Sequence, residues 1–274
     1  MATRPRRTCL AVPGSSTRML AKAAGLPADE IVVDLEDGVP PGEKEAARAR
    51  LGEAAALGTL AVRINGLRTE WWRDDLAAVG IRRPDVVVVP KVESAGEVRA
   101  VAELLPEGVG LEVQIETARG LAEVERIAAA SAGPLEALVF GPGDFAASMG
   151  IPVLTIGAGA FEYALARISV AAHANGLQAI DGPYADLHDL DGLRRAAAVA
   201  LGHGFDGKWV VHPDQIEPVN EAFTPTAEEL ERARRIMAAE DGASRLEGDM
   251  VDVATKRLAA AVLARASHAR GEAR

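Results

Sequence analysis

Two acidic residues follow short apolar runs of this chain at positions where they could do chemistry. Glu116 follows directly on Gly110–Ile115, and Asp144 comes shortly after Leu135–Phe140. Neither has a histidine or cysteine nearby, so the two carboxylates form a set of hard oxygen donors. Such a set suits Mg²⁺, which takes one or two carboxylates and completes its octahedron with water and substrate oxygens. Alternatively, each carboxylate pairs with a lysine or caps a helix.

Three further carboxylates, Asp34, Glu36 and Asp37, are crowded at the end of another apolar run. They cannot all be metal ligands, because crowded anions raise one another's pKa and need cations beside them. Neighbouring positions supply three such cations: Lys44, Arg63 and Lys91. We expect the second and third carboxylates to orient Arg63, Lys91 or a metal-bound water around the metal ligands. An ion-pair network with a purely structural role is an equally good interpretation.

Basic side chains suggest a place for an anion. Arg63 ends an apolar run, and its planar donor fork matches a carboxylate or a developing enolate oxygen. Arg18 and Lys22 lie four residues apart after Pro13-Gly14, so a helix would place them on one face. The start of that helix adds free backbone N–H groups that favour phosphate. Together they could hold a phosphorylated cofactor, although such a pair is more often an ordinary solvated face.

Eight apolar runs of strand length predict the elements that position these residues. Helical segments separate most of them, and strands that alternate with helices specify a parallel sheet. Eight strands favour a closed (β/α)8 TIM barrel, whose active site lies where the strands end. Glu116 and Asp144 would then be neighbours at the barrel mouth. The runs are Thr8–Val12, Glu30–Leu35, Thr59–Ile64, Asp85–Val89, Gly110–Ile115, Leu135–Phe140, Gln178–Ile180 and Lys208–Val211.

The helix start and stop signals of the C-terminal part predict a helical extension to the barrel. Thr226 is a good N-cap for a helix that runs to about Ala239 and breaks at Asp241-Gly242. A loop at Gly248–Asp252 and a last helix to about Ala266 follow. We therefore expect two parts: a barrel over residues 1–222, and a helical extension with a flap over residues 223–274.

Composition excludes several classes of protein. The 274 residues are 49% hydrophobic with a net charge of −10, which argues against nucleic acid or an anionic membrane as the main partner. A single cysteine, Cys9, rules out an internal disulfide framework.

No run has signal-peptide or membrane-spanning length, so we expect a cytoplasmic protein. The five histidines show no metal spacing, and for His212, at the eighth strand end, a structural role is the better interpretation.

Several motifs occur together in this chain: Val12–Ser15, Asp34–Asp37, Arg63–Gly66, Pro90-Lys91, Ile115–Thr117, Gly141–Asp144, Gly204–Lys208, His212-Pro213 and Met250–Asp252. Together they resemble the citrate lyase β-subunit-like family of the HpcH/HpaI aldolase group, with the closest likeness to L-malyl-CoA/β-methylmalyl-CoA lyases. The likeness runs from about Thr8 to Ala266. Ser16 departs from the lyases, which have a CoA-contacting arginine there, and an insertion is missing between Gly157 and Ala164.

The resemblance implies a role for each matching residue. Glu116 and Asp144 would bind Mg²⁺, and Arg63 would hold the substrate and its thioester enolate. Asp252, on the C-terminal flap, would be the acid/base. That flap would close over a neighbouring subunit's barrel, which implies a trimer or hexamer. The remaining substrate and CoA contacts would come from Ala11, Arg18, Lys22, Gly143, Trp209 and Val210.

The function implied is a Mg²⁺-dependent carbon–carbon lyase. It would cleave or form a 3-hydroxyacyl-CoA, such as malyl-CoA or citramalyl-CoA, from a 2-oxoacid and a short acyl-CoA. Alternatives are a citrate lyase β-subunit that acts on an acyl-carrier thioester and a malyl-CoA thioesterase. A non-catalytic paralogue is a further alternative, which the retained Glu116, Asp144, Arg63 and Asp252 argue against.

Overall fold

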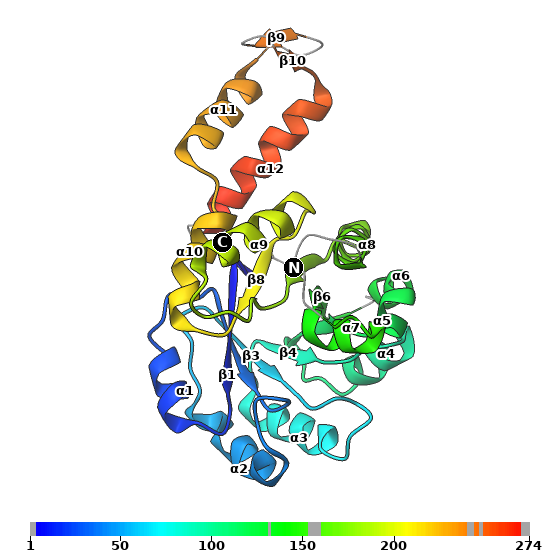
Figure 1. Ribbon diagram of the computed structural model, residues 1–274. Helices are drawn as coiled ribbons and strands as arrows, with labels where there is room; N and C mark the ends of the chain where they lie inside the picture. The colour runs from blue at the N-terminus through cyan, green and yellow to red at the C-terminus, as the bar shows by residue number, and fades with distance from the viewer. Residues whose placement is uncertain (1–3, 131–132, 153–159, 240–243, 247–248, 270–274) are drawn as a thin grey trace.

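Eight parallel strands close into a barrel in the order of the chain, which confirms the predicted fold (Figure 1). The computed structural model describes residues 4–130, 133–152, 160–239, 244–246 and 249–269. The strands are β1 Thr8–Pro13, β2 Glu30–Asp34, β3 Thr59–Arg63, β4 Val86–Val89, β5 Gly110–Ile115, β6 Leu135–Phe140, β7 Gln178–Asp181 and β8 Gly207–Val210.

Helices follow the strands and cover the outside of the barrel (Figure 1). Two helical segments are interrupted: the one that begins at Lys44 continues as a 3₁₀ turn at Arg50–Glu53, and the one that begins at Ala118 divides at Glu123. The helices are α1 Thr17–Ala23, α2 Lys44–Ala49, α3 Trp72–Arg82, α4 Ala95–Ala102, α5 Ala118–Ala122, α6 Val124–Ala128, α7 Pro142–Met149, α8 Ala160–Ala174, α9 Leu190–Gly202 and α10 Ile216–Phe223.

Apolar side chains pack on both faces of the strands, because successive residues of a strand point to opposite sides. On β2, Val33 packs in the large cluster between strands and helices, whereas Val32 packs in a smaller interior cluster. Ala61, Ala137 and several valines fill that interior together with Trp209. Small side chains therefore account for a core built with few aromatics.

Ion pairs close the end of the barrel where the strands begin. The buried guanidinium of Arg6 lies among three carboxylates, those of Glu30, Glu112 and Glu136. Burial raises the pKa of both Glu30 and Glu112, and Arg6 opposes the shift. Because these charged groups fill the end where the strands begin, the open mouth of the barrel is at the end where the strands finish.

A helical arm extends from the barrel after α10 (Figure 1). It consists of α11 Ala227–Ala238, the antiparallel strands β9 Ser244–Leu246 and β10 Asp249–Val251, and α12 Val253–Ala269. Thr226 caps α11 as predicted, in a capping box with Glu229. The loop predicted at Gly248–Asp252 was wrong over Asp249–Val251, because this segment pairs with β9. Residues 241, 242 and 248, which that prediction also used, lie outside the described residues.

Candidate active site

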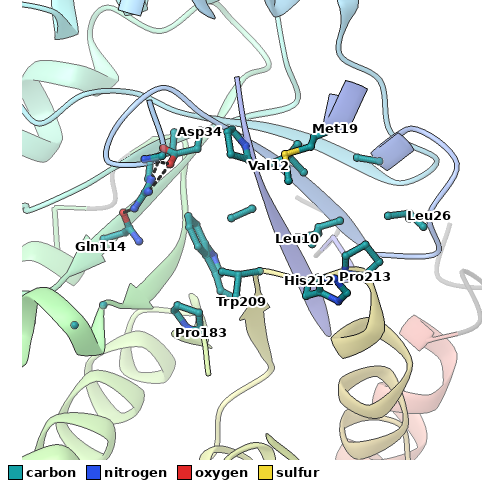
Figure 2. Close-up of a pocket in the computed structure, with 18 of the residues that line it drawn as sticks. Leu10, Val12, Met19, Leu26, Asp34, Gln114, Pro183, Trp209, His212 and Pro213 are labelled. Atoms are coloured by element: carbon teal, nitrogen blue, oxygen red, sulfur yellow. Dashed lines mark hydrogen bonds and ion pairs between the residues drawn. The ribbon is translucent and has the colours of Figure 1, made fainter. Parts of the chain in front are cut away.

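A cavity of about 660 Å³ opens where the strands end. Figure 2 shows it extending from Asp34 and Gln114 at one end, past Trp209, to Met19 and Leu26 of the α1 region at the other. Ligand sites of barrel enzymes lie at this end of the strands. The cavity is therefore the candidate active site.

The two carboxylates predicted to hold a metal line this cavity together. Glu116 follows β5, and Asp144 lies in the first turn of α7, which Pro142 starts after β6. Gly141 leaves room for Glu116 beside the start of α7, because a Cβ there would overlap the Glu116 carboxylate. Glu116 Oε1 accepts a hydrogen bond of 2.8 Å from the backbone N–H of Lys91, and Asp144 Oδ2 lies 3.3 Å from Lys91 Nζ.

The surroundings of Glu116 disfavour its charged form. Burial raises its pKa to about 8, and the negative charges of Glu36 and Asp144 add to the effect, while Arg63 and Lys91 oppose it. A buried carboxylate with too little positive charge around it is suited to a cation. Among the described residues, no group of three or more His, Cys, Asp or Glu side chains could hold a metal. Two carboxylates that leave positions for water and substrate oxygens still fit Mg²⁺.

Arg63 reaches the cavity from the end of β3, but its fork is already engaged. Nε and Nη2 donate to Asp34 at 2.8 and 2.7 Å. Nη1 lies 3.1 Å from Glu36 and 3.3 Å from Gln114 Oε1. The guanidinium also lies 5.3 Å from the centre of the Trp209 ring. Asp34, Glu36 and Gln114 therefore hold Arg63 in place at the cavity, and its role toward a substrate stays a prediction.

The crowded carboxylates pair largely as expected. Lys91 Nζ contacts Glu36, and it lies 3.1 Å from Asp37. Although burial opposes it, the hydrogen bond with Glu36 raises the pKa of Lys91 above its ordinary value, so the ammonium stays charged. Lys44 lies beside the same carboxylates, and its ammonium donates to the backbone carbonyls of Leu35 and Glu36, both at 2.7 Å. It holds the backbone of the loop instead of a carboxylate side chain.

The predicted cofactor contacts lie mostly on the wall of the same cavity. Ala11, Arg18, Lys22, Gly143 and Trp209 all line it. Val210, by contrast, is fully buried and is absent from the described lining. The reason is the strand alternation, which turns Trp209 into the barrel and Val210 toward the helices.

Asp252, the predicted acid/base, lies on the arm and does not line the cavity of its own chain. It caps α12 on the arm, where Oδ1 accepts a hydrogen bond of 2.9 Å from the Thr255 N–H. That backbone hydrogen bond lowers the pKa of Asp252 below its ordinary value. In this position the carboxylate is a helix cap on an arm that points away from the barrel (Figure 1).

Two site residues escaped the sequence-based prediction. Asp34 was seen as one of three crowded acids, but it is the direct partner of Arg63, since the two residues are opposite each other in the β2–β3 register. Gln114 lines the cavity from β5. Its position two residues before Glu116 could have identified it, because residues two apart on a strand face the same side.

The comparisons with known proteins show the family of this chain and agree with its fold. The model of the HpcH/HpaI aldolase/citrate lyase family matches residues 7–213. A (3S)-malyl-CoA thioesterase of Cereibacter sphaeroides is 42% identical over 88% of this chain and 85% of its own length. An L-malyl-CoA/β-methylmalyl-CoA lyase of the same species is 37% identical over 96% and 95%.

A solved structure extends the likeness to three dimensions. The protein CitE from Mycobacterium tuberculosis, in complex with magnesium, acetoacetate and coenzyme A, superposes with a TM-score of 0.84 at 35% identity, over 95% of this chain and 97% of that one. The molecule is thus a barrel of the aldolase type. It belongs to the HpcH/HpaI aldolase/citrate lyase family, and the resemblance inferred from its motifs is confirmed. Within the described residues no helix is long and apolar enough to cross a membrane.

Proposed function

We propose that this chain is a Mg²⁺-dependent carbon–carbon lyase that cleaves or forms a 3-hydroxyacyl-CoA such as malyl-CoA or citramalyl-CoA. The substrates in the forming direction are a 2-oxoacid and a short acyl-CoA. One observation carries the proposal: a single cavity has Glu116, Asp144 and Arg63 in its wall, and the basic residues Arg18 and Lys22 as well. A cation-binding pair and a phosphate-binding pair on one cavity suit a substrate with an oxoacid part and a CoA part.

Each residue has a defined task in this proposal. Glu116 and Asp144 hold Mg²⁺, which supplies Lewis-acid polarisation and a template for the substrate oxygens when it is bound. Arg63, fixed by Asp34, presents its remaining N–H groups to the negative charge that develops on the thioester enolate. Arg18 and Lys22 contact the phosphates of CoA. Glu36, Asp37, Lys44 and Lys91 surround and orient these groups.

The test is the release of glyoxylate from malyl-CoA with and without EDTA. We expect acetyl-CoA and glyoxylate in equal amounts, and loss of turnover after chelation that added Mg²⁺ restores. A rate that chelation leaves unchanged would exclude the metal-dependent reaction. Arg63→Met should lower turnover strongly while the variant still binds Mg²⁺.

A thioesterase is the second candidate, because a relative of 42% identity has the name (3S)-malyl-CoA thioesterase. The same assay separates the two reactions: hydrolysis releases free CoA and malate, whereas cleavage releases acetyl-CoA and glyoxylate. The third candidate is a citrate lyase β-subunit that acts on a carrier-bound thioester. Turnover of free CoA thioesters at a rate typical of enzymes would argue against it.

We also propose that the protein is a cytoplasmic trimer or hexamer, with the barrel over residues 1–222 and the arm over residues 223–274. The position of Asp252 supports this arrangement, since an arm that points away from its own barrel (Figure 1) can bring Asp252 to another subunit. As the acid/base, Asp252 would move the proton there once closure dries the site. Mixing inactive Arg63→Met and Asp252→Asn subunits should restore activity, because some sites then combine two intact residues. A monomer in solution, or mixtures without activity, would refute the proposal.

A further inference from the structure

Lys91 has an unusual backbone conformation that no element of secondary structure requires. Its φ of 55° lies in the left-handed region, which side chains other than glycine rarely adopt. Such a conformation persists where surrounding contacts hold it, and it concentrates at functional sites. Here it allows one residue to reach two groups at once: its backbone N–H donates to Glu116 at 2.8 Å, while its ammonium turns toward other carboxylates.

The ammonium of Lys91 lies between two sets of anions. On the β2 side it contacts Glu36, and it lies 3.1 Å from Asp37. On the α7 side it lies 3.3 Å from Asp144. The Lys91 and Asp144 side chains are 31% and 39% exposed, so both can move. The lysine therefore holds a positive charge at the same carboxylate that the proposed function assigns to the metal.

We propose that Lys91 is a positioning residue that serves as a built-in counter-cation of the metal site. Without a divalent ion it pairs with Asp144 and keeps that carboxylate turned into the cavity. When an ion binds, Lys91 keeps its contacts with Glu36 and Asp37 and gives up Asp144, because an ammonium and a divalent cation repel each other at one carboxylate. Lys91 consequently weakens metal binding while it keeps the site in order. This inference rests on the proposed metal site at Glu116 and Asp144.

Titration calorimetry with Mg²⁺ tests the inference without any measurement of turnover. Lys91→Met removes the competing charge and keeps the backbone N–H, so we expect it to bind Mg²⁺ about fivefold more tightly, the size of a partly exposed ion pair. Lys91→Arg keeps the charge and should stay close to the unchanged protein. Asp37→Asn removes an alternative partner of Lys91, so the lysine stays longer at Asp144 and Mg²⁺ binds about twofold more weakly.

Mg²⁺ affinity should rise in Lys91→Met and fall in Asp37→Asn, and these opposite changes distinguish the proposed role from a purely structural one. If Lys91 only supported the fold, Lys91→Met would weaken Mg²⁺ binding, and that result would overturn the inference. Should Lys91→Met fail to fold, Asp37→Asn decides: unchanged or tighter Mg²⁺ binding refutes the counter-cation. Glu116→Gln separates this inference from the proposed function. If that variant still binds Mg²⁺ with unchanged affinity, the metal site itself is wrong; if it loses Mg²⁺ while the Lys91 and Asp37 variants show the wrong signs, only the role of Lys91 fails.

Discussion

The pair formed by Asp34 and Arg63 gives the sharpest test of how the site is held together. Two parallel hydrogen bonds join them at 2.8 and 2.7 Å, and the Arg63 and Asp34 side chains are only 12% and 6% exposed. Removing one partner of a buried ion pair leaves an uncompensated charge, at a typical cost of about 3–5 kcal/mol. We therefore expect Asp34→Asn to lower the free energy of unfolding by about 3 kcal/mol, since Asn keeps the shape of the side chain.

Urea unfolding followed by circular dichroism measures this loss, and a double-mutant cycle isolates the pair. The variants are Asp34→Asn, Arg63→Met and the combination of both. Once one partner is gone, removal of the other relieves an unpaired charge, so the double variant should be more stable than the sum of the single losses by about 2 kcal/mol. A coupling below about 0.5 kcal/mol, the level found for independent sites, would refute the pairing as an energetic feature.

The pH dependence of the same variant gives an independent check. Burial opposes ionisation of Asp34, but the charge and hydrogen bonds of Arg63 outweigh it and lower the pKa of the folded state. The carboxylate thus stabilises the fold above its unfolded pKa of about 3.9, and this contribution is lost as the pH falls toward the lower folded value. The stability difference from Asp34→Asn should be constant from pH 5 to pH 8 and should shrink below pH 4. A stability difference that shrinks toward pH 8 would contradict the lowered pKa of Asp34.

Three further predictions concern the metal carboxylates and the closed end of the barrel. Because the pKa of Glu116 is about 8, a cation must displace its proton, so Mg²⁺ affinity should increase from pH 6 to pH 9 with proton release in the calorimeter. Gly141→Ala would overlap the Glu116 carboxylate and should weaken Mg²⁺ binding about tenfold. Gly143→Ala meets open space and is the matched control. Burial raises the pKa of Glu30, so stability in urea should fall as the pH rises from 5 to 8, and Glu30→Gln should flatten that slope.

Each of these predictions has an outcome that contradicts it. Mg²⁺ affinity that is equal at pH 6 and pH 9 would mean that Glu116 is already ionised or is no ligand. If Gly141→Ala and Gly143→Ala weaken Mg²⁺ binding equally, the loss comes from a change at the start of α7 and not from the space beside Glu116. If Glu30→Gln leaves the pH dependence of stability in urea unchanged, a group other than Glu30 causes that dependence.

The sequence by itself determined the barrel and the places of its candidate ligands. Eight apolar runs match eight strands, with bounds that differ by at most one residue. This worked because buried parallel strands are continuous apolar runs, a signal that needs no knowledge of distant contacts. Since neighbouring strands finish at the same end of a barrel, the carboxylates after β5 and β6 had to meet. Helix α10 and the β9–β10 pairing were missed, because short elements give weak periodicity.

Only the tertiary structure decided how the charged groups divide their partners. Asp34 accepts two hydrogen bonds from Arg63, because the β2–β3 register places Asp34 and Arg63 side by side, whereas Glu36 contacts only Nη1. Lys44 holds backbone carbonyls, and Lys91 reaches Glu116 through a left-handed backbone. Such choices depend on distances between segments far apart in the chain, which residue types and spacing do not contain. The physical reason is that ion pairing is set by geometry and burial, whereas strand formation is set by local hydrophobic pattern.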